Sequence, residues 1–263
     1  MTTPEAAPPN EPVGAVTALF RERADVARMF RSHLATSAVE RGLLGPREIP
    51  RLWERHILNC VAISAFVPQK STMVDVGSGA GLPGLAIAIA RPDVEVTLVE
   101  PLQRRVGWLD EVVADLGLTN VMVVRARAED LRGHLLVEVA TARAVAALPV
   151  LAGWCLPLLQ PAGRLLALKG RTAEAELAAS VDALRNLGAQ RWQVRQVGGG
   201  VLTEPTTVIE VIAGRLPDRR GGGPGRKRER RSAAGGDAGS RSSTWGSSGR
   251  GHGGPLGRRG RSR

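Results

Sequence analysis

The sequence predicts an α/β fold in which a seven-stranded, doubly wound, Rossmann-like sheet follows an N-terminal helical cap. Three observations support this prediction. Short apolar runs alternate with helical patterns from residue 72 onward, which is typical of a parallel sheet with helices on both faces. A glycine-rich turn at residues 77–84 joins the first apolar run to the first of these helices. The last two apolar runs have no helix between them, which indicates one antiparallel strand near the end.

The residues before the sheet predict the cap, which we assign to residues 13–70. From about Val13 to Leu43, apolar side chains recur at three- and four-residue steps among Arg and Glu. Gly45-Pro46 ends this pattern, and a second helical stretch runs over residues 47–66. Residues 1–12 are rich in Pro, Glu and Ala and are expected to form a disordered leader.

The sheet and its helices are expected to occupy residues 71–214. The predicted strands are residues 72–76, 94–99, 121–124, 137–142, 164–168, 192–197 and 206–212. The predicted helices are residues 81–90, 102–116, 148–159 and 173–187. Pro161 and Gly163 are expected to end the helix over 148–159, since both residues interrupt helices.

The net charge of +11 comes from residues 215–263, which hold 14 Arg or Lys and 3 Asp or Glu. This Gly-, Arg- and Ser-rich tail has almost no apolar side chain to bury, so we expect it to be disordered. It is either a neutral extension or a flexible arm that binds phosphates through charge alone. The rest of the chain carries equal numbers of acidic and basic residues.

Composition excludes several classes of protein. Cys60 and Cys155 fit no metal-binding or redox spacing. The N-terminus lacks a basic segment followed by an apolar one, and no apolar run approaches the ~20 residues that span a membrane. We therefore expect a soluble, cytoplasmic protein without a bound metal or a membrane partner.

The glycine turn predicts a ligand site, because glycine lets backbone approach a ligand and the following helix offers free N–H groups. Dinucleotides and S-adenosylmethionine both use such a turn. Asp75 precedes Gly77 by two residues, where a carboxylate would repel a pyrophosphate but suit an ammonium and a sulfonium. A strict G-x-G-x-x-G begins only at Gly79, and Leu82 takes the sixth position when Gly77 is counted first. The turn therefore favours S-adenosylmethionine over NAD.

Further polar residues follow the other predicted strands at the edge where ligands bind in open α/β sheets. Glu100 ends the second strand, where an acid accepts hydrogen bonds from a ribose. Glu129 and Asp130 follow the third strand, either beside the adenine or as acids at a helix start. Arg143 and Lys169 follow the fourth and fifth strands, where a cation needs an anionic partner, either a substrate or a structural carboxylate.

These residues resemble those of the bacterial 16S ribosomal RNA guanine-N7 methyltransferases, the small-subunit methyltransferase G or glucose-inhibited division protein B family. The resemblance covers about Val16 to Ile212 and rests on Val74-Asp75-Val76-Gly77-Ser78-Gly79-Ala80-Gly81-Leu82-Pro83-Gly84, Arg91-Pro92, Glu100-Pro101-Leu102, Arg127-Ala128-Glu129, Arg143-Ala144 and Leu168-Lys169-Gly170. Arg55-His56-Ile57-Leu58-Asn59 is similar to an N-terminal helical motif of the family. The basic tail is not part of the family pattern.

The resemblance implies a class I methyltransferase fold and S-adenosylmethionine-dependent N7-methylation of one guanine, guanine 527 in the 530 loop of 16S ribosomal RNA. The implied partner is the small ribosomal subunit or its precursor, and we expect a monomer. The family pattern places Gly77, Leu82, Ala128, Glu129 and Arg143 around the methyl donor. Together with the residues placed by sheet geometry, the expected cofactor-binding set is Asp75, Gly77, Gly79, Gly81, Leu82, Glu100, Ala128, Glu129 and Arg143.

The expected chemistry needs few polar groups. Guanine N7 has a free lone pair, so no general base is required, and none of the four histidines follows a predicted strand. Catalysis would come from in-line positioning in a dry cleft. Lys169 and Arg143 are expected to orient the guanine or its phosphate, because N7 and O6 both accept hydrogen bonds. His56 and Asn59 either close the substrate cleft from the cap or only pack and cap a helix.

Three other functions remain open at this point. The first is a methyltransferase that acts on another RNA, a protein or a small molecule. The second is an NAD-dependent oxidoreductase, which Asp75 and Leu82 disfavour. The third is a non-enzymatic RNA-binding protein whose active part is the basic tail.

Overall fold

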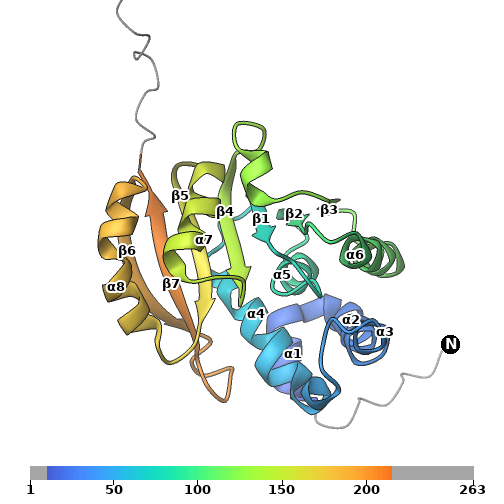
Figure 1. Cartoon of the computed structure of the whole chain (residues 1–263). Helices are drawn as coiled ribbons and strands as arrows, with labels where there is room; N and C mark the ends of the chain where they lie inside the picture. The colour runs from blue at the N-terminus through green and yellow to red at the C-terminus, as the bar shows by residue number, and fades with distance from the viewer. Residues whose placement is uncertain (1–10, 215–263) are drawn as a thin grey trace, which may run out of the picture. The chain divides into compact units, whose positions relative to one another are not determined.

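The computed structural model describes residues 11–214, which form a seven-stranded sheet packed between helices (Figure 1). The strand order is β3-β2-β1-β4-β5-β7-β6, and β7 is antiparallel to both of its neighbours. The strands are β1 (Thr72–Val76), β2 (Glu95–Val99), β3 (Val121–Val124), β4 (Val137–Arg143), β5 (Leu159–Lys169), β6 (Ala189–Val197) and β7 (Thr206–Ala213). The predicted class I methyltransferase sheet, with one antiparallel strand near its end, is confirmed.

Helices cover both faces of the sheet, and each face has its own hydrophobic cluster. On one face the cap helices α1 (Val13–Phe20), α2 (Ala24–Ala35), α3 (Ser37–Glu40) and α4 (Asn59–Ala62) share a cluster with α5 (Gly84–Ala90) and α6 (Gln103–Asp115). On the other face, α7 (Leu148–Cys155) and α8 (Ala173–Asn186) cover β4, β5 and β7. The cap therefore packs on the same face of the sheet as α5 and α6.

The cap is more broken than the sequence predicts. The first expected helix is interrupted at Arg21, whose φ is +52°, and again at Thr36. The second becomes a 3-10 turn at Pro46–Arg51, a π-helical segment at Leu52–Leu58, the short α4 and a second 3-10 turn at Ile63–Phe66. Neither interruption of the first helix lies at a Gly or Pro, the residues from which a break would be predicted.

Several other boundaries were predicted wrongly, among them the starts of β5 and β6, which were expected at residues 164 and 192. The helix expected over 148–159 ends as α7 at Cys155, followed by a 3-10 turn at Leu156–Leu158. Pro161 and Gly163 lie inside β5, because Ala162 adopts a φ of +65° and the β4–β5 register shifts there, as in a β-bulge. The helix expected from Gly81 begins at Gly84, since residues 77–83 form the loop itself.

Helix α5 lies unusually close to β1 and β2, and Gly84 makes this approach possible. A Cβ atom on Gly84 would lie 2.7 Å from Asp75 Oδ2 and would also overlap the Leu98 side chain. Asp75 Oδ2 instead accepts a hydrogen bond of 3.0 Å from the Gly84 backbone N–H. The Asp75 side chain is fully buried, and burial raises the pKa of Asp75 to about 7, against the opposing hydrogen bond from the Gly84 N–H.

Among residues 11–214, no helix is long and apolar enough to cross a membrane. The leader expected over residues 1–12 falls almost wholly outside the described residues, and so does the basic tail of residues 215–263. The proposed boundary between a cap at 13–70 and a sheet domain at 71–214 stays a prediction, and the two segments share one hydrophobic cluster.

Replacement of Gly84 by Ala should destabilise the fold by ~1–3 kcal/mol, because the added methyl group forces α5 away from Asp75 and Leu98. Urea unfolding of the purified protein measures the change. Gly107→Ala in α6 is the matched control, since a Cβ there meets no atom within 4 Å. It should leave stability unchanged or raise it by up to ~1 kcal/mol. Equal effects of the two substitutions would contradict the close-packing explanation.

Replacement of Asp75 by Asn should remove a pH-dependent loss of stability. Between the ordinary aspartate pKa near 4 and the folded value of about 7, the folded wild-type protein holds a proton that the unfolded chain has released. Rising pH therefore destabilises the wild type over this window, by up to ~4 kcal/mol. The unfolding free energy of Asp75→Asn relative to wild type should rise from pH 4 to 7 and then level off.

Urea unfolding at several pH values measures this difference. Asp110→Asn, which changes an exposed carboxylate of α6, is the control and should run parallel to the wild type. A pH-independent difference between Asp75→Asn and the wild type would show that the Asp75 pKa is not raised in the fold.

Candidate functional site

The glycine loop forms one wall of a cleft of about 560 Å³ at the carboxyl ends of β1, β2, β3 and β4. Gly77 and Gly79 have φ values of +73° and +54°, in the left-handed region that favours glycine. A Cβ atom on Gly77 would lie 2.9 Å from Cγ2 of Val145, across the cleft wall. The loop therefore needs glycine both for its backbone conformation and for the space beside Val145.

Glu100 at the end of β2 ties the loop to the neighbouring turn. Its carboxylate is 1% exposed, and Oε2 accepts a hydrogen bond of 3.0 Å from the Gly79 N–H. The other oxygen, Oε1, accepts one of 3.1 Å from the Leu102 N–H. A carboxylate has about four acceptor positions, so Glu100 keeps acceptor capacity toward the cleft that it lines. This position suits a ribose hydroxyl.

Seven of the nine residues predicted to bind the cofactor line this cleft. They are Gly77, Gly79, Leu82, Glu100, Ala128, Glu129 and Arg143. The structure places the other two, Asp75 and Gly81, outside the lining. Asp75 lies beneath the loop, where its Oδ2 accepts a hydrogen bond from the Gly84 N–H. Its other oxygen, Oδ1, has no hydrogen-bond partner among the described residues. Asp130 accepts a bond from the Arg127 N–H and so serves as a helix-start acid.

Sequence reasoning missed several residues of the cleft. Leu43 and Leu44 reach it from the loop after α3, Arg105 from α6 and Trp154 from α7. Arg105 is the only one of these four with a usable signal, because it follows Glu100 by five residues and approaches its carboxylate at 3.5 Å. The other three arrive through tertiary packing of distant segments.

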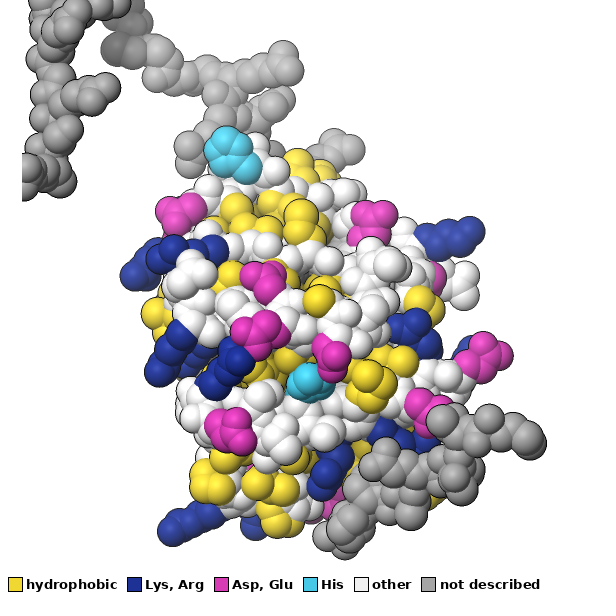
Figure 2. Space-filling model, turned by 90° about the vertical axis from the view of Figure 1, so that its right-hand side faces the viewer, with side chains coloured by type: hydrophobic (Ala, Val, Ile, Leu, Met, Phe, Trp, Pro, Cys, Tyr) yellow, Lys and Arg dark blue, Asp and Glu magenta, His cyan; other side chains and the backbone are white. Residues whose placement is uncertain are grey.

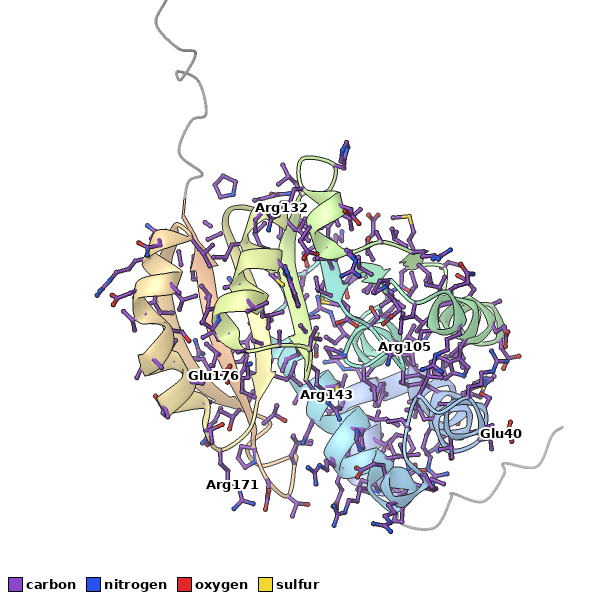
Figure 3. The ribbon with its side chains drawn as sticks, viewed as in Figure 1. Glu40, Arg105, Arg132, Arg143, Arg171 and Glu176 are labelled. Carbon is purple, nitrogen blue, oxygen red and sulfur yellow. The ribbon has the colours of Figure 1, made fainter. Side chains whose placement is uncertain are left out.

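A second cavity, of about 880 Å³, lies between the cap and the ends of β4 and β5. Arg143 and Ala144 line both cavities and so form part of the wall between them. Figure 3 shows Arg143 where β4 meets the cap helices. The second cavity contains five cations, Arg51, Arg55, Arg143, Lys169 and Arg171, and three acids, Glu54, Glu176 and Glu204.

The two cations predicted to act on the substrate have different surroundings. Lys169 Nζ lies 2.7 Å from Glu176 Oε1 and 3.1 Å from the carbonyl oxygen of Ala146. Arg143 forms no salt bridge with a carboxylate among residues 11–214. Its guanidinium donates instead to the side chain and carbonyl oxygen of His56 and to Cys60 Sγ. Arg143 thus has no carboxylate in direct contact at the boundary of both cavities.

The two cap residues predicted near the substrate, His56 and Asn59, do not lie at the same cavity. Asn59 lines the second cavity, and its carbonyl oxygen accepts a bond of 3.3 Å from Thr206 Oγ1. His56 is 5% exposed and lines neither cavity. Its Nε2 lies 2.7 Å from Glu48 Oε2, and its Nδ1 faces Arg143. Burial and the Arg143 guanidinium lower the pKa of His56, against the opposing effect of Glu48.

One face of the molecule has a surface of mixed charge. Figure 2 shows acidic, basic and apolar side chains interleaved over one face. Within the described part of the chain, no three His, Cys, Asp or Glu side chains are grouped so that they could hold a metal ion.

The first cleft suits S-adenosylmethionine. It offers a glycine cradle that a Cβ on Gly77 would obstruct and, in Glu100, a buried carboxylate at the ribose position. The volume is in the range of small-molecule sites. The second cavity then meets the first at Arg143, where a methyl acceptor could approach.

Comparison with known proteins agrees with this geometry. A family model described as GidB, rRNA small subunit methyltransferase G, matches residues 24–203. The ribosomal RNA small subunit methyltransferase G of Pseudarthrobacter chlorophenolicus is 56% identical over 194 residues, 74% of this chain and 90% of that protein. The protein of the same name from Salinispora tropica is 50% identical over 218 residues, 80% of this chain and 90% of that protein.

Solved structures show more distant likeness. A precorrin-6y C5,15-methyltransferase from Geobacter metallireducens has 17% identity and a TM-score of 0.45, over 65% of this chain and 90% of that one. A 16S rRNA (adenine(1408)-N(1))-methyltransferase variant from Catenulisporales acidiphilia, with its cosubstrate SAM, has 19% identity and a TM-score of 0.46, over 61% and 93%.

The family match confirms the resemblance, the methyltransferase activity and S-adenosylmethionine as the methyl donor. It also excludes the alternatives of an oxidoreductase and of a non-enzymatic binder. The GidB model matches most of the described residues, and the two relatives named above are 56% and 50% identical and are each covered over 90% of their length. The chain therefore belongs to the ribosomal RNA small subunit methyltransferase G family.

Proposed function

We propose that this enzyme methylates N7 of guanine 527 in the 530 loop of 16S ribosomal RNA. The observation that carries the proposal is Arg143, an arginine without a carboxylate partner among residues 11–214 that lines both cavities. A guanine in the second cavity would present N7 and O6, two acceptors that suit an arginine. The names of the relatives, which specify the small-subunit ribosomal RNA, support this substrate.

The methyl-donor site would use the seven predicted residues that line the first cleft. Glu100 would accept hydrogen bonds from the ribose while it holds the Gly79 loop, and Ala128 and Glu129 would lie beside the adenine. Asp75 and Gly81 would act from beneath, by fixing the loop on α5. When bound, S-adenosylmethionine supplies a methyl group activated by its positively charged sulfur.

The chain's own contribution to the reaction would be position. Guanine N7 carries a free lone pair, so no side chain has to remove a proton before the transfer. Arg143 would hold the base edge or its phosphate at the boundary of the two cavities. Lys169 would act as a secondary contact, because Glu176 and the Ala146 carbonyl oxygen already accept from its ammonium. Asn59 lines the same cavity and would contact the RNA from the cap.

The biological setting follows from the same substrate. The partner would be the small ribosomal subunit or its precursor, and the enzyme would act as a cytoplasmic monomer. Arg51, Arg55 and Arg171 line the second cavity without a carboxylate partner among the described residues. They would neutralise phosphates that flank the target guanine. The basic tail of residues 215–263 would add charge-based affinity for the RNA.

Replacement of Glu100 by Gln should weaken S-adenosylmethionine binding by ~10–100-fold, because the neutral amide is a poorer acceptor for both the loop and the ribose. Isothermal titration calorimetry with the methyl donor measures the affinity. Glu111→Gln, an exposed glutamate of α6 that pairs with Arg41, is the control and should bind normally. Normal binding by Glu100→Gln would rule out this placement of the methyl donor.

Replacement of Arg143 by Ala should lower methyl transfer by at least ~100-fold, since a misplaced acceptor loses the in-line geometry. Lys169→Ala should cause a smaller loss, because Glu176 already compensates this lysine. The assay is mass spectrometry of 16S RNA from small subunits of a strain lacking the enzyme, incubated with each variant. Arg185→Ala on the exposed side of α8 is the control. Full methylation by Arg143→Ala, or a methyl group on another nucleotide, would overturn the proposed function.

A further inference from the structure

Arg143 is held by neutral groups of the cap. One terminal nitrogen of its guanidinium donates to Cys60 Sγ at 3.1 Å and to the His56 carbonyl oxygen at 3.4 Å. The other donates to His56 Nδ1. Other half-buried arginines of the described chain, such as Arg28 and Arg91, pair with carboxylates. Arg143 is thus anchored without losing the charge that a substrate would use.

The contact with Arg143 fixes the protonation of His56. An arginine N–H can only donate, so His56 Nδ1 must accept and cannot carry a proton. The proton of the neutral ring therefore lies on Nε2, which is 2.7 Å from Glu48 Oε2. Glu48 accepts this N–H and so selects the tautomer that Arg143 requires.

The backbone around His56 is built to hold the ring in place. His56 lies in the π-helical segment Leu52–Leu58, an uncommon conformation that is frequent at functional sites. Its neighbours Trp53 and Ile57 are buried in the cluster shared by the cap and the sheet. Glu48 lies in the preceding 3-10 turn, and a third of its side chain is exposed. A chain of contacts thus runs from the surface of the cap through His56 to Arg143.

We propose that Glu48 and His56 act as positioning residues, which hold the Arg143 guanidinium at the wall between the two cavities without touching the RNA themselves. This assigns His56 a role different from substrate contact, since the ring lines neither cavity. The proposal rests on the proposed function, because it requires that Arg143 acts on the methyl acceptor.

The test is a double-mutant cycle in the full-length enzyme, with kcat and KM measured on small subunits that lack the modification. His56→Ala should lower kcat by ~10–100-fold with little change in KM for the subunit, because Arg143 loses its alignment. In the Arg143→Ala background the same substitution should cause no further loss.

A multiplicative loss in that background would show that His56 acts independently of Arg143. A rise in KM alone would indicate direct contact with RNA. Either result overturns the proposal.

Substitutions of Glu48 keep the test valid if His56→Ala does not fold. Glu48 is partly exposed, so Glu48→Ala should fold and should lower kcat, whereas Glu48→Gln should recover most of it through its amide oxygen. His33→Ala is the matched control, since His33 Nε2 pairs with Asp115 Oδ2 at 2.6 Å elsewhere on the cap. It should keep wild-type turnover. Full activity of both Glu48 variants would overturn the proposal.

The outcomes distinguish failure of the proposed function from failure of the positioning role. Full methylation by Arg143→Ala would remove the basis of the proposed function and of the positioning role together. Loss of activity in Arg143→Ala, with normal turnover in His56→Ala and Glu48→Ala, would leave the proposed function intact and reject only the positioning role.

Discussion

The geometry of the site depends on how closely α5 packs against β1 and β2. The absence of a side chain on Gly84 allows its N–H to reach the Asp75 carboxylate at 3.0 Å. That contact fixes the start of α5, so residues 77–83 must cross from β1 to the helix in a short loop with left-handed glycines. Glu100 then holds the loop from the neighbouring strand through the Gly79 N–H. One tight helix–sheet contact thus determines where the cleft lies.

The sheet was predictable because its signals are local. The run from Met73 to Val76 is apolar except for Asp75, and glycines follow it directly, so strand, turn and ligand edge could all be placed from the sequence. The helical cap was also predicted, but its breaks at Arg21 and Thr36 were not, because neither residue is a Gly or Pro. Pro161 led to the opposite error. We expected it to end a helix, but it lies inside β5, where a β-bulge accommodates it.

The residues of the candidate site also divide into those that could be placed from the sequence and those that could not. Gly77 and Glu100 follow strands directly, so chain order places them at the cleft. Leu43, Leu44 and Trp154 reach the cleft only because the cap and α7 fold over it, and no spacing along the chain encodes that. The different surroundings of Arg143 and Lys169 could not be predicted from the sequence either. Both follow apolar strands, but only Lys169 has a carboxylate, Glu176, one turn into the next helix.

The cap therefore belongs to the site as much as the sheet does. It supplies Leu43 and Leu44 to the first cavity, and Asn59 to the second. It also supplies the neutral acceptors on which Arg143 rests, at a point where a carboxylate would have cancelled the guanidinium charge. The body of the protein has no net charge, so its attraction for RNA has to come from where cations are left unpaired. Packing the cap against the end of β4 leaves Arg143 as such a cation at the boundary of the two cavities.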